Sequence, residues 1–294
     1  MNHEVTENRL RGIEAHPGKG HYAVFDHGAH AWAWQPDGQR PVLWMSTQSA
    51  FANGQPIRGG IPVIFPWFGA GSQGTLSPLH GFVRLTDWNR YYIDDTIDLN
   101  GRLVVEYQID RTRVGTQSEF PFAFMAQLRL IFTHEYLQIG LKINNADVVP
   151  FTFEEAFHTY LAVGDARHVT LDGLEGTPYL DRSAGAPTPD AVQSGLVRIE
   201  GETDRLYSHH GSVTLDDPTW SRTLLVSKEG SANTVVWNPW AAKAAAMPDF
   251  GDDEWTQMIC IEAANVGANA ITLAPGETHL MRQRISLVGT APTR

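Results

Sequence analysis

Residues 123–145 read AFMAQLRLIFTHEYLQIGLKINN, and this stretch decides the fold class. Its two halves, residues 123–134 and 136–145, each have the length of a strand. Apolar and polar side chains alternate in both halves, with the period of two expected when one face of a sheet is buried. The stretch therefore predicts two antiparallel β-strands.

Segments of the same kind lie on both sides of this stretch. They occupy residues 21–28, 29–36, 102–110, 151–163, 212–217, 223–229, 233–239, 257–264 and 279–288. Turn-forming sequences lie between them at residues 35–38, 99–101, 228–230 and 274–276, as in meanders of antiparallel strands. Because long amphipathic helical periodicity is absent, the chain is predicted to be all-β.

The chain has 294 residues and no low-complexity linker, so we expect one domain over residues 1–294. The small-residue segment from Asp181 to Asp190 is interpreted as a surface loop inside that domain. A single sheet wider than about ten strands curls or splits. We therefore expect large antiparallel sheets that stack on one another rather than one open sheet.

The composition narrows the partners and the compartment. The formal net charge of −11 argues against nucleic acid or an anionic membrane as the main partner, because both are bound chiefly through excess Lys and Arg. A single cysteine, Cys260, excludes an intrachain disulfide and fits a reducing compartment. The first residues contain no signal-peptide pattern, and no run of about 18 apolar residues could span a membrane. We expect a cytoplasmic protein.

The densest local motif runs from Pro56 to Gly69, PIRGGIPVIFPWFG, and carries one cation, Arg58. Each proline removes a backbone donor and each glycine loosens the chain, so the motif predicts an irregular loop rather than a central strand. Arg58 could hold an anion there through paired N–H donors. The alternative is a surface arginine that pairs with a carboxylate.

A second motif, HGFVR, places His80 and Arg84 four residues apart, with a glycine at position 81 that permits close backbone approach. His80 could donate a hydrogen bond to a sugar hydroxyl, and Arg84 could bind a phosphate. A turn followed by an edge strand would explain the same residues without a ligand.

Residues 151–160, FTFEEAFHTY, are interpreted as a strand with two different faces. Phe151, Phe153 and Phe157 share one face with Glu155, and Glu154 and His158 share the other with Ala156 and Tyr160. A polar strand face in an apolar protein either meets solvent or lines a pocket. Glu154 and His158 are therefore pocket candidates.

Glu262 follows the nearly pure apolar run Met258-Ile259-Cys260-Ile261, with no cation in the strand to pair with it. Carboxylates almost never enter a core unpaired. Glu262 therefore either ends the strand in water or lies in a functional cleft with a shifted pKa. The aromatic sequence 235–240, VVWNPW, could supply flat apolar surface for a sugar ring or simply fill a core.

Motifs for other chemistries are missing from the sequence. There is no H-E-x-x-H, no H-x-H pair, no Walker loop and no G-x-S-x-G elbow. We therefore expect neither a metal nor a cofactor.

Seven motifs together resemble the glucose-6-phosphate 1-epimerase branch of the aldose 1-epimerase family, also called hexose-6-phosphate mutarotases. The similarity spans most of the chain, in order, and as a set the motifs are highly specific. They are PIRGGIPVIFPWFG, HGFVR, FTFEEAFHTYLAVGD, ETDRLY at residues 202–207, VVWNPWAAKAAAMPDF, CIEAANV and LAPGETH. The resemblance implies a β-supersandwich of the galactose mutarotase type.

The same resemblance implies an isomerase that interconverts the α and β anomers of a hexose 6-phosphate. His158 would be the general acid and Glu262 the general base of ring opening. The enzyme would need no cofactor, would bind a small sugar phosphate as its partner, and is expected to be a monomer.

The resemblance also assigns substrate contacts. Arg58 and Arg84 would hold the phosphate, while His80 and Asp204 would contact the sugar. Leu79 departs from the family, because relatives commonly carry a polar glutamine at this position. A hydrogen bond to substrate from that side chain is therefore not expected here.

Two other functions remain open at this point. An epimerase of unphosphorylated aldoses would keep His158 and Glu262 but would need no cationic site. A non-catalytic carbohydrate-binding β-sandwich would need neither an acid nor a base.

Overall fold

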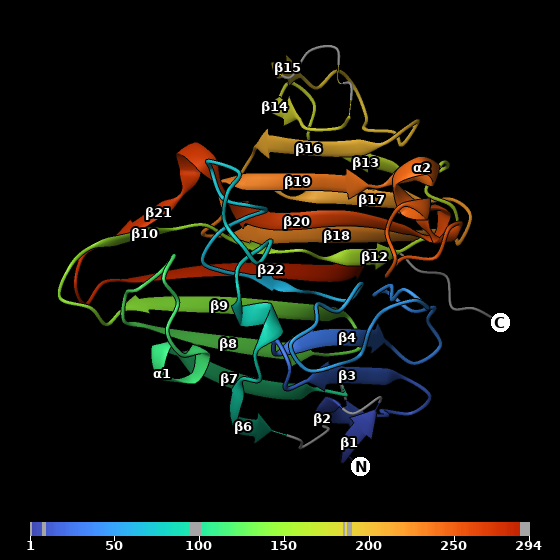
Figure 1. Ribbon diagram of the computed structural model, residues 1–294. Helices are drawn as coiled ribbons and strands as arrows, with labels where there is room; N and C mark the ends of the chain where they lie inside the picture. Colours follow the sequence, from blue (N-terminus) through green and yellow to red (C-terminus); the bar gives the residue numbers. More distant parts are fainter. Residues whose placement is uncertain (1, 8–9, 95–100, 185, 187–189, 289–294) are drawn as a thin grey trace.

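Antiparallel strands make up most of the chain in the computed structural model, which describes residues 2–7, 10–94, 101–184, 186 and 190–288 (Figure 1). The strands form two large sheets of eight strands each, a sheet of four strands and a sheet of two strands. All pairs of neighbouring strands in these sheets are antiparallel. The predicted all-β fold with stacked antiparallel sheets is confirmed.

The first large sheet, here called sheet I, has the strand order β13-β17-β18-β22-β9-β8-β7-β6. Its strands are β6 (Asn89–Asp94), β7 (Leu103–Asp110), β8 (Phe124–Phe132), β9 (Tyr136–Asn145), β13 (Thr170–Asp172), β17 (Val213–Asp217), β18 (Arg222–Glu229) and β22 (Thr278–Val288). The two strands predicted within residues 123–145 are β8 and β9, which pair directly. Buried and less buried residues alternate along both strands, as the sequence pattern predicts.

The second large sheet, sheet II, has the order β15-β14-β16-β19-β20-β11-β5, and β12 also pairs with β20. Its strands are β5 (Val63–Ile64), β11 (Glu155–Phe157), β12 (Tyr160–Ala162), β14 (Pro178–Asp181), β15 (Asp190–Val192), β16 (Thr203–Ser208), β19 (Asn233–Asn238) and β20 (Met258–Asn265). Strands β19 and β20 are buried along their whole length, because they lie at the centre of the sheet.

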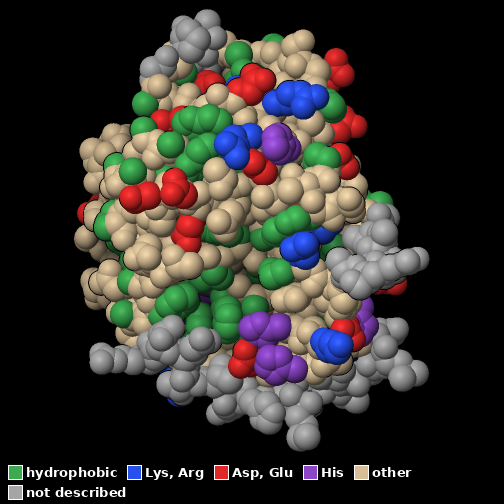
Figure 2. Space-filling model, turned by 90° about the vertical axis from the view of Figure 1, so that its right-hand side faces the viewer, with side chains coloured by type: hydrophobic (Ala, Val, Ile, Leu, Met, Phe, Trp, Pro, Cys, Tyr) green, Lys and Arg blue, Asp and Glu red, His purple; other side chains and the backbone are tan. Residues whose placement is uncertain are grey.

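The smaller elements complete the fold. The four-stranded sheet contains β1 (Asn2–Glu7), β2 (Leu10–Ala15), β3 (His21–Phe25) and β4 (His30–Gln35), and the two-stranded sheet contains β10 (Phe151–Phe153) and β21 (Ile271–Leu273). The short helices are α1 (Arg111–Val114), α2 (Trp240–Ala245) and the 3₁₀ helices η1 (Val83–Leu85), η2 (Glu254–Gln257) and η3 (Gly267–Asn269). On the face shown in Figure 2, acidic side chains are interspersed with basic ones.

One large hydrophobic core joins these sheets. It contains Leu128 and Ile139 of sheet I, Val236 and Ile261 of sheet II, and Tyr22 of the four-stranded sheet. The stacking of the two large sheets follows from their patterns, because each sheet must bury its apolar face against another layer. The assignment of residues 1–294 to one domain stays a prediction.

Residues 151–160 differ from the single continuous strand that was predicted. The chain is interrupted at Glu154 and again at His158 and Thr159, so the segment forms parts of β10, β11 and β12. The Thr159 N–H donates to the carbonyl of Phe157, a local turn that a regular ladder does not contain. The two predicted faces are nevertheless present, since Phe151, Phe153 and Phe157 enter the large core while Ala156 and Tyr160 belong to a second apolar cluster.

The loops and helices of the structure bear on three further expectations from the sequence. The segment 56–69 is largely irregular, as predicted, and contains only the two residues of β5 as strand. Residues 99 and 100 of the turn at 99–101 and part of the loop from Asp181 to Asp190 lie outside the described residues. Among the described residues, no helix is both long and apolar enough to cross a membrane.

Gln283 of β22 is a buried polar link between the two large sheets. Its Nε2 donates to the carbonyl oxygen of Ile261 in β20 at 2.9 Å, and its Oε1 accepts from the Thr159 hydroxyl at 2.5 Å. Gln283 and Thr159 are fully buried. These bonds tie sheet I to the part of sheet II that carries His158 and Glu262.

Replacement of Gln283 by alanine should lower the free energy of unfolding by about 3 kcal/mol, because two buried polar groups lose their partner. Denaturant unfolding followed by circular dichroism measures this change. Exposed Gln48 offers a matched control, and Gln48→Ala should change the free energy by less than about 0.5 kcal/mol. Equal effects of the two variants would contradict a role for the buried link.

Candidate active site

A cavity of about 590 Å³ opens onto sheet II, and His158 and Glu262 both line it. Glu262 lies on β20, and His158 lies between β11 and β12, which both pair with β20. The register explains how the two residues meet. Phe157 is opposite Ala263 and Tyr160 is opposite Cys260, so His158 stands opposite Glu262. Nδ1 of His158 and Oε1 of Glu262 are 3.4 Å apart.

Burial controls the charge of Glu262, whose side chain is 1% exposed. Removal from water raises the pKa of the Glu262 carboxyl well above its usual value, and Asp204 raises it further while Arg182 opposes the shift. Its second oxygen, Oε2, has no hydrogen-bond partner among the described residues. Glu262 thus lines the cavity with one carboxyl oxygen buried and without a hydrogen-bond partner.

His158 experiences the opposite shift. Burial lowers the pKa of its imidazole well below the usual value, and the neighbouring His80 ring and the positive charges of Arg58 and Arg84 oppose its protonation further. Nδ1 lies 3.5 Å from Cys260 Sγ and faces Glu262, so Nε2 is the nitrogen that remains for a ligand. The ring stacks on Tyr160, with centroids 4.6 Å apart and planes inclined by 9°.

In the free site, burial therefore favours the neutral form of both groups. The expected reaction instead uses an ionised Glu262 and a protonated His158. The neutral pair and the ion pair hold the same number of protons, because transfer of one proton from Glu262 to His158 converts the first into the second.

His80 also lines the cavity, and its tautomer follows from its contacts. Its Nδ1 accepts a hydrogen bond from the Gly69 N–H at 3.1 Å, so in the neutral ring the proton is on Nε2. Burial, followed by the charges of Arg84, Arg58 and Arg182, lowers the pKa of His80 to about 3. His80 is therefore a neutral ring whose Nε2–H can donate to a ligand, and the predicted contact with a sugar hydroxyl stays a prediction.

The close backbone approach predicted beside His80 is present at Gly81. A side chain at this position would place its Cβ 2.0 Å from the carbonyl oxygen of Phe65. Gly81 also has φ of 70°, which favours glycine. The residues that follow form η1 rather than the edge strand considered as an alternative.

Arg58 lines the cavity but already has partners. Its Nε and Nη2 donate to the carboxylate of Asp249 at 3.2 Å each, and its Nη1 donates to the Tyr160 hydroxyl at 2.9 Å. The alternative that Arg58 pairs with a carboxylate is therefore correct as far as Asp249 is concerned. The guanidinium nonetheless keeps two of its five N–H donors for a ligand.

Arg84 has a different environment. Its Nη2 donates to the carbonyl of Leu79 at 2.8 Å, while its Nε is buried and without a partner. Among the described residues no carboxylate forms an ion pair with it. Burial lowers the pKa of Arg84 to about 10, and Arg58 contributes to this shift. Arg84 is not among the residues that line the cavity, but its positive charge lowers the pKa of His80 and of His158.

Asp204 reaches the cavity from β16, where it forms an ion pair with Arg182 at 2.7 Å. Arg182 and Lys243 are two further cations of the lining that the sequence did not reveal. The Arg182 guanidinium lies 5.0 Å from the ring centroid of Phe68, and Lys243 pairs with Glu202 at 2.8 Å. In the sequence, Arg182 lies in a Pro-rich segment and Lys243 lies in the motif 235–250. Neither position indicates a ligand.

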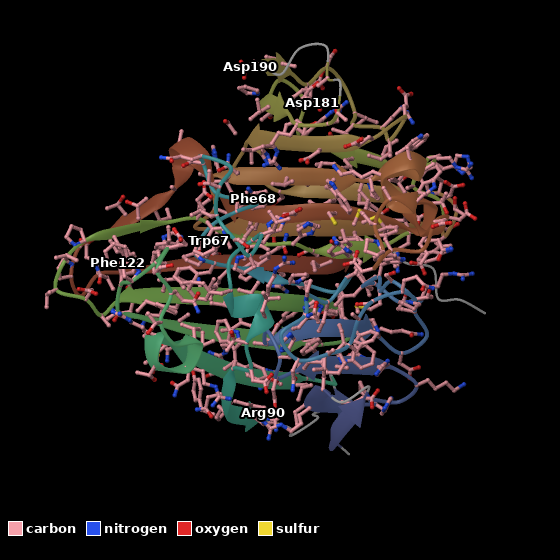
Figure 3. All side chains as sticks on the ribbon, in the orientation of Figure 1. Trp67, Phe68, Arg90, Phe122, Asp181 and Asp190 are labelled. Carbon is pink, nitrogen blue, oxygen red and sulfur yellow. The ribbon has the colours of Figure 1, made fainter. Side chains whose placement is uncertain are left out.

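Glu154, predicted to face a pocket, lines the cavity, and its carboxylate is bound by two backbone N–H groups. One carboxylate oxygen accepts from the Phe68 N–H and the other from the Gly267 N–H, both at 2.8 Å. Figure 3 labels Phe68 on the loop that passes in front of the strands of sheet II. Glu154 therefore holds this loop and the end of β20 together on either side of the cavity.

Trp237 of the predicted aromatic segment lines the cavity, and its ring meets His158 edge-on with centroids 5.8 Å apart. Trp240 instead packs against Trp255 at 4.2 Å. Packing by tryptophan therefore occurs within this segment, and the use of Trp237 as a surface for a sugar ring stays a prediction.

One potential metal-ligand group consists of two cavity residues, His158 and Glu262, and the buried Cys260 beside them. His158, Cys260 and Glu262 offer a nitrogen, a sulfur and an oxygen within 4.8 Å of one another. All three residues are buried, and burial raises the pKa of the Cys260 thiol well above its usual value, which disfavours the thiolate that a metal needs. The expectation of a reaction without a metal stays a prediction.

The comparisons with known proteins give the family. The family model of aldose 1-epimerase matches residues 13–286, so the chain belongs to the aldose 1-epimerase family. The predicted resemblance and the predicted class of enzyme, an epimerase, are confirmed.

Individual relatives make the similarity more specific. A protein of Cenchrus ciliaris that carries the provisional name glucose-6-phosphate 1-epimerase is 34% identical over 90% of this chain and 80% of its own. A protein of Escherichia coli K12 with the same provisional name is 31% identical over 81% of this chain and 77% of its own. The crystal structure of a protein of Salmonella typhimurium, provisionally named a mutarotase, superposes with a TM-score of 0.84 at 26% identity, covering 96% of this chain and 91% of that one.

The raised pKa of the Glu262 carboxyl predicts how the free energy of unfolding depends on pH. Above pH 4.5 the unfolded chain loses the proton of this carboxyl while the folded protein retains it, so this group makes the folded state less stable as pH rises. Glu262→Gln should remove the effect. The variant should gain in free energy of unfolding relative to the wild type, by up to about 1.4 kcal/mol for each pH unit until the folded carboxyl ionises.

Denaturant unfolding of both proteins between pH 4 and pH 8 measures the difference. Parallel curves for the variant and the wild type would show that burial does not hold the Glu262 carboxyl in its protonated form.

Proposed function

We propose that this chain interconverts the α and β anomers of a hexose 6-phosphate by opening and closing the sugar ring. The observation that carries the proposal is the pair of His158 Nδ1 and Glu262 Oε1, 3.4 Å apart at one cavity. An acid and a base so close together suit a reaction that moves two protons about a single hemiacetal. Membership of the aldose 1-epimerase family and the names of the relatives support the same activity.

Ring opening needs a proton to leave the C1 hydroxyl while another reaches the ring oxygen O5. Glu262 accepts the first proton as general base, and His158 donates the second as general acid. Each such step contributes about 100-fold to 10,000-fold. Rotation about the bond between C1 and C2, followed by ring closure with the roles exchanged, gives the other anomer.

The charged forms needed for this reaction arise within the pair. Transfer of one proton from Glu262 to His158 produces the carboxylate and the imidazolium without any exchange with solvent. Binding of an anionic substrate favours the imidazolium, because a nearby negative charge raises the pKa of a histidine. His80, held neutral with its proton on Nε2, then donates to a sugar oxygen without competing as an acid.

The cations of the cavity favour a phosphorylated substrate. Arg58, Arg182 and Lys243 line the cavity, and the half-buried Arg84, whose Nε is buried, carries a charge that no described carboxylate compensates through an ion pair. A buried charge without a counter-ion is costly, and a bound phosphate would relieve that cost. The binding energy of this remote group also positions the reacting carbon.

Polarimetry of mutarotation tests the activity directly, with freshly dissolved α-glucose 6-phosphate and α-glucose as parallel substrates. Faster equilibration of the phosphate supports the proposal, whereas equal acceleration of both sugars would indicate an epimerase of unphosphorylated aldoses. No acceleration of either sugar would leave only a carbohydrate-binding sandwich. The expected monomeric state and cytoplasmic location, and the expected absence of nucleic-acid and membrane partners, stay predictions.

Glu262→Gln and His158→Asn should each lower kcat by about 100-fold or more, because each removes one general acid or base step. The wild-type enzyme should show a bell-shaped pH dependence that reports the two macroscopic pKa values of the pair. Polarimetric rates between pH 5 and pH 9 measure both effects. A Glu262→Gln enzyme that keeps its rate within a few-fold would refute the role of Glu262 as the base.

Arg58→Ala should raise KM for hexose 6-phosphate about ten-fold or more, because a hydrogen bond to a charged group contributes about 1.5 to 3 kcal/mol. KM for the free hexose should change far less. Arg129, whose side chain is 54% exposed on sheet I, provides the matched control. Arg129→Ala should alter neither constant, and an equal rise of KM for both sugars in Arg58→Ala would contradict the phosphate contact.

A further inference from the structure

The hairpin that joins β2 to β3 gathers two histidines and a glutamate outside the cavity described above. The donor atoms of Glu14, His16 and His21 all lie within 4.8 Å of one another. Glu14 Oε1 contacts His21 Nε2 and lies 3.7 Å from His16 Nε2. Figure 2 views this end of the molecule and shows histidine and acidic side chains gathered beside hydrophobic ones.

Strand geometry brings the three side chains together. Glu14 and His16 are two residues apart, so they project from the same face of the strand. The pairing of Ala15 with Tyr22 places the next two residues, His16 and His21, opposite each other. Their rings stack with centroids 5.0 Å apart and planes inclined by 9°.

The backbone between the histidines has little freedom. The Gly20 N–H donates to the carbonyl of Pro17 at 2.8 Å and closes the turn. Gly20 also has no room for a side chain, since a Cβ there would lie 2.9 Å from the carbonyl oxygens of Gln35 and Pro17. His21 in addition packs edge-on against Trp32, with ring centroids 5.1 Å apart. The ligand atoms are therefore held close together before any ion arrives.

We propose that Glu14, His16 and His21 form a binding site for a divalent transition-metal ion, with zinc as the ion to be tested. Two imidazoles and one carboxylate suit zinc and its neighbours better than calcium or magnesium, which prefer oxygen ligands. Zinc takes nitrogen and oxygen ligands at about 2.0 to 2.2 Å, and the three ligand atoms lie within 4.8 Å of one another.

The site is accessible to ions from solvent. The side chains of His16, His21 and Glu14 are 51%, 27% and 21% exposed. Three protein ligands leave a fourth position for water or another small ligand. The ion would cross-link β2 and β3 and so stabilise the four-stranded sheet, because it binds the folded hairpin and not the unfolded chain.

Isothermal titration with zinc chloride tests the site in the full-length protein. The wild type should bind one zinc ion at the hairpin and melt at a higher temperature when zinc is present. His16→Ala and His21→Ala should each weaken the affinity by about ten-fold or more, since loss of even an outer partner of a metal ligand weakens binding 10-fold to 100-fold. Affinity should also fall at acid pH, because a bound imidazole must be neutral.

His168, with a side chain 64% exposed, provides the matched control for loss of a surface histidine. His168→Ala should bind zinc as the wild type does. His16 is half exposed, so His16→Ala should fold normally even if His21→Ala does not, and unchanged mutarotation would confirm its folding. Zinc binding to His16→Ala with wild-type affinity would overturn the proposal. Zinc that inhibits turnover through His158, Cys260 and Glu262 without binding at the hairpin would also overturn it.

Discussion

The pairing of β11 and β12 with β20 is the constraint on which the site depends. One register holds on both sides of the interruption at residues 158–159, and it places the imidazole of His158 opposite the carboxylate of Glu262. A shift of this register by one residue would turn every side chain of the strand to the other face. The buried amide of Gln283 stabilises the arrangement from sheet I, because it binds both Thr159 and Ile261.

Burial then decides the chemistry of the pair. The same removal from water raises the pKa of Glu262 and lowers that of His158, so the charged form of each group is disfavoured in the free protein. Conversion of the neutral pair into the ion pair only moves a proton from Glu262 to His158, so this proton stays within the site. The cations around His80 act in the same direction on His158, and an anionic ligand would offset them. The fold thus links the charge of a bound ligand to the protonation of His158 and Glu262.

Much of the fold and part of the site could be predicted from sequence. The period of two in residues 123–145 identified β8 and β9 correctly, and the prolines and glycines of residues 56–69 indicated an irregular loop. His158, Glu262, His80, Arg58 and Asp204 were predicted as site residues, and all five line one cavity. Arg84 does not line this cavity, and Arg182 and Lys243, which do, were missed. These arginine and lysine positions depend on how loops pack, which no local pattern records.

The sequence by itself determined the class of fold, the apolar faces of the strands and the isolation of Glu262 among apolar neighbours, because these are properties of side chains close together in the chain. Only the tertiary structure decided which partners they meet. Residues 158 and 262, or 58 and 249, are brought together by strand register and by loop packing across about a hundred or more positions. Such long-range contacts are specified by the cooperative packing of the whole core and not by any single segment.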